Sequence, residues 1–267
     1  MFALLYQNFL FGQSVIKAEK KSILTMQEKE ILSESFTSYD LMSLESTKLK
    51  KDLREKNKYF KCEIPSDLLG NRTLEIEENE IRTTDFQSFI SNGKEKTKLE
   101  RKKECDTYKG YIDGDEEQWL RLYADDNMIM GMFHLKDKGD IFIEPLFNVT
   151  KLPSSKNKYI VYAKSALKDK KAICGSSQLD KVVNSTNISR SGARNPWNMC
   201  RVVRVAIETD GEWNLLFGGY GPAFAAINYA NGVYQSQFNL RIEVSFAETW
   251  SDPTWDPIRC FKCFRSS

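Results

Sequence analysis

The sequence contains one histidine, His134, and this count restricts the catalytic chemistry that the chain can carry. A Ser-His-Asp triad would depend on that residue alone, and a zinc site with two or three histidine ligands is impossible. His134 lies in the run MFHLK, within a segment that alternates apolar and polar residues as a strand does. We therefore interpret it as a structural histidine rather than as a ligand or a general base.

Carboxylates are the next candidates for chemistry. Asp113, Asp115, Glu116 and Glu117 could support acid–base catalysis or calcium binding. They surround Gly114, however, and acidic residues around a glycine are typical of a solvated turn. We favour the turn, and we expect Glu144, which precedes Pro145, to pack or to cap a turn.

The six cysteines are too few for a dense disulfide scaffold and too many for a cytosolic minimum. Cys260 and Cys263 have the spacing of half a zinc knuckle, but no second pair matches them, so we interpret them as incidental tail residues. Cys174-Gly175 stands before a polar segment. On its own, such a pair is more often a buried or disulfide-bonded cysteine than a functional one.

Composition indicates a folded chain and excludes several classes of partner. The chain is 41% hydrophobic and 28% charged, which is enough apolar material for a core. Its formal charge is +2, so the electrostatic footprint of a nucleic-acid or membrane-surface protein is missing.

Two features indicate a secretory route. Residues 1–14 (MFALLYQNFLFGQS) resemble the apolar part and cleavage end of a signal peptide without the basic start. A buried N-terminal element is the alternative, and the run is too short to span a bilayer. We expect no membrane anchor. Potential N-glycosylation sites occur at four positions: Asn71, Asn148, Asn184 and Asn187.

The elements that would position these residues differ along the chain. Residues 15–60 are rich in Lys, Glu and Ser and could be helical or loosely ordered with strands. Residues 105–165 alternate apolar and polar residues between Gly, Asp and Asn turns, which predicts an antiparallel sandwich or barrel-like sheet. The charge run at 94–104 predicts a solvated loop.

The C-terminal third has a different pattern. Residues 175–198 are rich in Ser, Asn, Gly and Arg, as a linker is. A Val-rich strand at 200–210, a helix starting near Pro222 and an alternating strand at 240–250 follow. This order predicts the first β–α–β unit of an α/β domain, which should not fold alone because it leaves a sheet edge and an apolar helix face uncovered.

The stretch 105–146 contains, in this order, Cys105, Tyr108, Gly110, Gly114, Gly131 and Ile143-Glu144-Pro145-Leu146. This order resembles the pro-region of the adamalysin/reprolysin (ADAM-like) zinc metalloproteases. Residues 200–206 (CRVVRVA), 228–234 (NYANGVY) and 239–250 (NLRIEVSFAETW) resemble the opening of the protease domain. The resemblance as a whole extends over about residues 59–257.

The resemblance implies a mainly antiparallel β pro-domain at 15–174, a linker at 175–198 and an incomplete α/β metalloprotease domain at 199–257, an α+β chain overall. Residues 258–267 stay unassigned. The resemblance also identifies Cys174 and Gly175 as a cysteine switch. A thiolate in the open position of a catalytic zinc displaces the nucleophilic water, and the adjacent glycine lets the backbone enter a narrow cleft.

The sequence departs from the family in three ways. The HExxHxxGxxH motif is absent, so zinc is implied only by the family and the chain should be inactive alone. The second cysteine of the pro-region is replaced near Asp125-Asp126, so Cys105 could pair with Cys62 or stay free. A dibasic processing site is missing, and 190–194 offers single arginines only.

Three functions remain open. The first is a precursor fragment of a secreted zinc endopeptidase, which is latent through Cys174 and whose family cleaves proteins. The second is a stand-alone pro-region that binds and inhibits a cognate metalloprotease domain in trans. The third is an unrelated secreted β protein with an interaction role.

Overall fold

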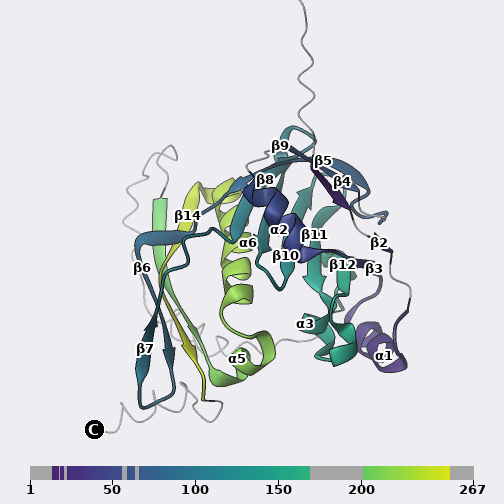
Figure 1. Ribbon diagram of the computed structural model, residues 1–267. Coiled ribbons are helices and arrows are strands. Elements are labelled where there is room, and N and C mark those ends of the chain that lie inside the picture. The colour runs from purple at the N-terminus through teal and green to yellow at the C-terminus, as the bar shows by residue number, and fades with distance from the viewer. Residues whose placement is uncertain are drawn as a thin grey trace, which may run out of the picture.

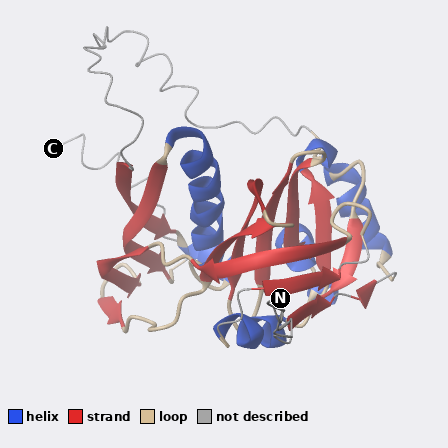
Figure 2. Cartoon of the chain, turned by 90° about the horizontal axis from the view of Figure 1, so that it is seen from above, coloured by secondary structure: helices blue, strands red, loops and turns tan. Residues whose placement is uncertain are grey.

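The computed structural model describes residues 14–17, 19–20, 23–55, 59–63, 66–168 and 201–252. This part of the chain is an α+β protein in which most strand pairs are antiparallel, as the sequence predicts. A large curved sheet and a small sheet lie on either side of a long helix, as Figure 1 and Figure 2 show.

The strands are β1 (Ser14–Lys17), β2 (Glu19–Lys20), β3 (Asp40–Ser43), β4 (Tyr59–Glu63), β5 (Asn71–Glu78), β6 (Arg82–Ser91), β7 (Lys96–Leu99), β8 (Thr107–Ile112), β9 (Asp115–Ala124), β10 (Ile129–Leu135), β11 (Gly139–Pro145), β12 (Tyr159–Ala163), β13 (Arg201–Thr209) and β14 (Leu240–Trp250). The helices are α1 (Met26–Ser35), α2 (Ser46–Arg54), α3 (Leu146–Thr150), α5 (Gly211–Phe217) and α6 (Gly221–Phe238), with short 3-10 turns η1 (Pro153–Ser155) and η2 (Lys164–Ala166).

The large sheet has ten strands in the order β1-β4-β5-β8-β9-β10-β11-β12-β3-β2. It curves around one core, because Phe60 near one edge and Met42 near the other belong to the same buried cluster. Leu49 and Leu53 of α2 complete that cluster, so α2 closes the concave side. The alternation at 105–165 predicted an antiparallel sandwich or barrel-like sheet, and the antiparallel pairing of these strands is confirmed.

The outer face of this sheet is covered by helices at two places. Leu32 of α1 and Leu146 of α3 pack against Ile160 and Tyr162 of β12. Further along the sheet, Phe224 of α6 packs with residues of β9, β10 and the small sheet in a separate cluster. Strand β9 is therefore buried on both faces from Trp119 to Ala124, although its sequence alternates like a half-buried strand.

The acidic turn expected around Gly114 joins β8 to β9. Asp113 and Gly114 have φ values of 55° and 71°, the left-handed pair that a two-residue hairpin turn requires. The Asp113 carboxylate bonds the Arg72 guanidinium and the Thr73 amide at 2.8 and 2.9 Å. The predicted turn is therefore present, with Asp113 in it and Asp115, Glu116 and Glu117 at the start of β9.

The small sheet has the order β13-β14-β6-β7. Strands β13 and β14 are parallel and α6 lies between them in the chain, so the predicted β–α–β unit is present. Pro222 lies in the first turn of α6, where its missing N–H costs nothing. Asp210 caps α5 by accepting a hydrogen bond from the Trp213 amide.

Strands of the small sheet come from two segments that the sequence assigned to successive domains. Strands β6 and β7 belong to residues 15–174, the N-terminal segment, and β13 and β14 belong to residues 199–257, the C-terminal segment. The second edge of β14 pairs in parallel with β6, which belongs to the 15–174 segment. The apolar face of α6 packs against β9, β8 and β10 of the large sheet. The edge and the helix face that a lone β–α–β unit would expose are therefore covered by residues of the N-terminal segment.

The prediction of a solvated loop over 94–104 is wrong for part of that range. Strand β7 pairs antiparallel with β6 at the edge of the small sheet. The Lys96 ammonium lies 4.6 and 4.9 Å from the rings of Phe89 and Phe246 and pairs with Glu248 at 2.5 Å. An exposed edge strand buries no side chains of its own, so its charged residues do not mark it as a strand in the sequence.

Candidate functional site

The most specific contact between the two segments is made by Asn228, which is fully buried on α6. Its amide nitrogen donates to the carbonyls of Tyr108 and Leu122 at 3.0 and 2.9 Å, on the neighbouring strands β8 and β9. Its oxygen accepts from Asn79 at 2.8 Å. Because every polar atom of this buried side chain is paired, it fixes the position of α6 on the sheet.

A second buried asparagine on the same helix ties α6 to the small sheet. Asn231 donates to the Ile242 carbonyl and accepts from the Ile242 amide, at 2.8 and 2.7 Å. Sequence reasoning missed both asparagines as functional residues. The signal was available, since two asparagines three residues apart interrupt an apolar helix.

Gly232 lets α6 approach β9 closely. A Cβ atom at this position would lie 2.4 Å from the Trp119 ring and 3.1 Å from Arg121 Cγ. A side chain there would therefore push the helix away from the sheet. Together, these three α6 residues place the start of the C-terminal segment firmly on the N-terminal one.

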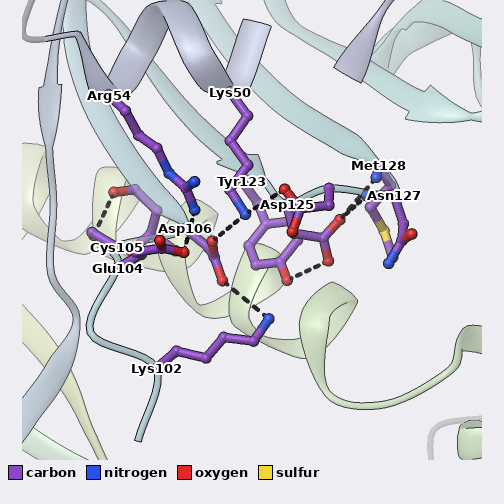
Figure 3. A network of polar contacts seen from close by, with 12 residues as sticks. Lys50, Arg54, Lys102, Glu104, Cys105, Asp106, Tyr123, Asp125, Asn127 and Met128 are labelled. Carbon is purple, nitrogen blue, oxygen red and sulfur yellow. Dashed lines mark hydrogen bonds and ion pairs between the residues drawn. The ribbon is translucent and has the colours of Figure 1, made fainter. Parts of the chain in front are cut away.

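A network of charged side chains lies at the end of the strand pair β8–β9 (Figure 3). The buried Lys50 ammonium of α2 lies 3.3 Å from Asp106 and 3.1 Å from Asp126. The hydrogen bond from Lys50 lowers the pKa of the Asp126 carboxyl. Asp125 accepts from Tyr123 Oη at 2.9 Å and from the amides of the turn after it.

Cys105 is free and buried beside this network. Pairing places Cys62 opposite Arg72, whereas Cys105 precedes Tyr108, which lies opposite Glu78. The Arg72–Glu78 stretch of β5 spans roughly 20 Å at about 3.3 Å per residue, and bridged cysteines need Cα atoms less than about 7 Å apart. This register places Cys62 too far from Cys105 for a disulfide, and Cys105 is free in the structure.

The turn that follows β9 lies next to Cys105, since the Ala124 amide donates to the Asp106 carbonyl at 2.8 Å. Lys50 of α2 connects the residue before β8 to this turn by its ion pairs to Asp106 and Asp126.

His134 is a structural residue, as the sequence suggests. Its Nδ1 lies 2.7 Å from Asp140 Oδ1, and its ring stacks on Trp119 with centroids 5.2 Å apart. Among the carboxylates of the hairpin, Asp115 and Glu117 pair with Lys136 at 2.8 and 2.7 Å.

A buried polar cluster that the sequence did not reveal surrounds Glu144. Tyr162 donates to Glu144 at 2.8 Å, and burial raises the pKa of the Glu144 carboxyl despite that bond. Burial also lowers the pKa of Lys151, whose ammonium lies 3.5 Å from the Phe217 ring centroid. Glu144 thus packs against Tyr162 near the end of β11, in agreement with the structural role expected for it.

The remaining predicted sites are placed as follows. Asn71 is exposed at the start of β5, whereas Asn148 is half-buried in α3 and its Nδ2 contacts Met130 Sδ at 3.7 Å. Thr150 of the Asn148 sequon is buried and bonds Ser155. The other predicted sites and segments lie outside the described residues: Cys174, Gly175, Asn184, Asn187, the linker, residues 1–13 of the expected signal peptide and the 258–267 tail.

The described residues do not fit a catalytic zinc. They contain no group of three or more His, Cys, Asp or Glu side chains able to hold a metal ion. The single histidine of the chain is committed to Asp140 and Trp119.

No family model matches the chain, and no curated protein matches it. No helix within the described ranges is both long and apolar enough to cross a membrane.

Proposed function

We propose that this chain is a fragment of the precursor of a secreted adamalysin-type zinc metalloendopeptidase. Residues 15–174 would form its latency pro-region, and 199–257 would open its protease domain. The observation that carries the proposal is the seating of α6 on the large sheet through Asn228. A pro-region that maintains latency has to hold the protease domain in one position, and a fully paired buried side chain gives such a fixed position.

The pairing of β6 with β14 supports the same proposal. A strand of the N-terminal segment completes the sheet of the C-terminal segment, so neither segment buries its apolar surface alone. A pro-region that assists folding of the domain after it would make contacts of this kind. In this proposal Cys174 supplies the thiolate that occupies the zinc of the protease domain, and the chain itself does not cleave peptides.

One observation favours the alternative of a stand-alone inhibitory protein. Among the described strands, β13 pairs only with β14. Val202 and Val203 on β13 are 50% and 43% exposed. An open strand edge with exposed valines could receive a strand of a cognate metalloprotease domain.

Inhibition in trans tests the proposal. The full chain would be titrated against a purified adamalysin-type catalytic domain, with hydrolysis of a quenched-fluorescent peptide as the readout. We expect inhibition by the unaltered chain and at least a tenfold weaker inhibition by Cys174→Ala, because the zinc-bound thiolate is lost. Cys263→Ala is the matched control and should inhibit like the unaltered chain.

Two results would overturn the proposal in different ways. A folded chain that neither binds nor inhibits the catalytic domain would remove the pro-region function altogether. Equal inhibition by the unaltered chain and Cys174→Ala would retain an inhibitory role but remove the cysteine switch.

A further inference from the structure

A cavity of about 280 Å³ lies between the C-terminal half of α6 and the strands β5, β8 and β9. Its floor is formed by the side chains of Trp119 and Arg121, which are both buried. Gln235 and Ser236 of α6 form one side. This volume is at the small end of the range for ligand sites, the size of an amino acid rather than of a nucleotide.

Arg121 carries a buried charge that the described part of the chain does not neutralise. Its side chain is on β9, and the residue is 6% exposed. One terminal nitrogen donates to the Leu120 carbonyl at 2.9 Å and the other to Gln235 Oε1 at 3.1 Å, both neutral groups. Its Nε is buried without a hydrogen-bond partner. None of the described carboxylates makes an ion pair with it.

Such an arrangement is costly for an isolated protein. A buried cation loses its hydration, and without a counter-ion no Coulombic attraction offsets that loss. Burial lowers the pKa of Arg121 to about 10, so the guanidinium still carries its charge at neutral pH. The Trp119 ring, whose centroid is 5.3 Å from the guanidinium carbon, stabilises it in part.

The rim of the cavity has the opposite charge. Glu75 and Glu116 line it and make no ion pair with the described residues, whereas Glu77 is paired with Lys109 at 3.1 Å. Acidic groups at the mouth disfavour a dianion. A ligand that fits both ends has one carboxylate for the floor and a cationic or neutral group for the rim.

We propose that this cavity binds a compact zwitterion of the amino-acid type. The ligand carboxylate pairs with Arg121, its apolar body lies along Trp119, and its ammonium faces Glu75 and Glu116. A free amino acid and the C-terminal residue of a short peptide present the same carboxylate, and a titration with both distinguishes the two sources.

Calorimetric titration of the full chain at low ionic strength tests the proposal with L-phenylalanine as the probe. We expect saturable binding of phenylalanine and at least tenfold weaker binding of phenylalaninamide, which lacks the carboxylate. Phenyllactate, which lacks the ammonium, should bind several-fold more weakly than phenylalanine. Glycyl-phenylalanine binding as tightly as phenylalanine would assign the site to peptide C-termini, and markedly weaker binding would assign it to free amino acids.

Variants locate the site. Arg121→Gln should weaken phenylalanine binding at least tenfold, and Glu75→Gln should weaken phenylalanine but not phenyllactate. Lys94→Gln, a substitution in an exposed turn away from the cavity, should change neither. The proposal fails if phenylalanine does not bind, if the amide binds equally well, or if folded Arg121→Gln binds normally. If Arg121→Gln does not fold, the comparison of ligands on the unaltered chain and the Glu75→Gln variant test the proposal instead.

Discussion

Glu28 is fully buried in the first turn of α1, and its carboxylate collects hydrogen bonds from two separate segments. Burial alone would raise its pKa, but bonds from the Thr25 amide, Ser155, Lys158 and Ser154 outweigh that effect and lower the pKa to about 2. The charged form therefore stabilises the folded chain above about pH 4.5, and this stabilisation is lost as the pH falls toward 2.

Glu28→Gln should lower the free energy of unfolding by about 2 kcal/mol at pH 7, because it leaves the partly buried Lys158 ammonium without its counter-ion. The difference between the variant and the unaltered chain should shrink between pH 5 and pH 2. Urea unfolding followed by circular dichroism at several pH values measures both effects. Glu30→Gln, on the exposed side of the same helix, is the control, and an equal loss in both variants would contradict the role of the Glu28 contacts.

Cys105 illustrates how burial controls reactivity. Burial raises the pKa of its thiol, which donates to the Thr107 carbonyl at 3.1 Å. We expect iodoacetamide at pH 8 to leave Cys105 largely unmodified in the folded chain and to label it in urea, because burial disfavours the reactive thiolate and shields the sulfur from the reagent. Peptide mass spectrometry reads out the site. Recovery of a Cys62–Cys105 disulfide peptide from the native protein would contradict the strand register.

At the level of elements, the close approach of α6 to β9 depends on Gly232. Alanine is the better helix former by about 1 kcal/mol. Gly232→Ala should nevertheless lower the free energy of unfolding by about 1–3 kcal/mol, because its Cβ would collide with the Trp119 ring. Thermal and urea unfolding measure the change, and Ser236→Ala, exposed on the same helix, should have little effect. A stabilised Gly232→Ala would show that α6 does not approach β9 this closely.

The elements also show what the sequence could predict. The hairpins of 105–165 and the β–α–β unit were predictable because alternation, turn residues and Pro222 are local signals. Strand β7 was not, since Lys96 and its neighbours bury little surface of their own. The covering of β9 on both faces was not predictable either, because the helix that covers Arg121 is more than a hundred residues away in the chain.

The same limit applies to the candidate site. His134 and the acidic hairpin were interpreted correctly because their neighbours in sequence define their surroundings. Asn228 and Arg121 acquire their roles from partners that are distant in sequence, such as Tyr108 and Gln235. Periodicity can mark such polar residues in buried elements as unusual, but it cannot say what they contact.

For the whole molecule, the two segments should unfold together. Strand β6 borders β14, and α6 packs against both sheets, so separating the segments would expose the cluster around Phe224. Native-state hydrogen exchange tests this, since a cooperative unit shows one common opening free energy in its slowest amides. We expect the slowest amides of β8 and of β14 to share that value.

Asn228→Ala makes the test specific. The substitution removes the bonds to the Tyr108 and Leu122 carbonyls and to Asn79, and should cost about 1–3 kcal/mol. If the segments form one unit, the opening free energies of β8 and β14 should fall together by that amount. If β14 alone becomes labile while β8 keeps its protection, the segments fold independently and α6 is only docked on the large sheet. A latency pro-region needs the first behaviour, because a domain that opens on its own cannot be held inactive by the one before it.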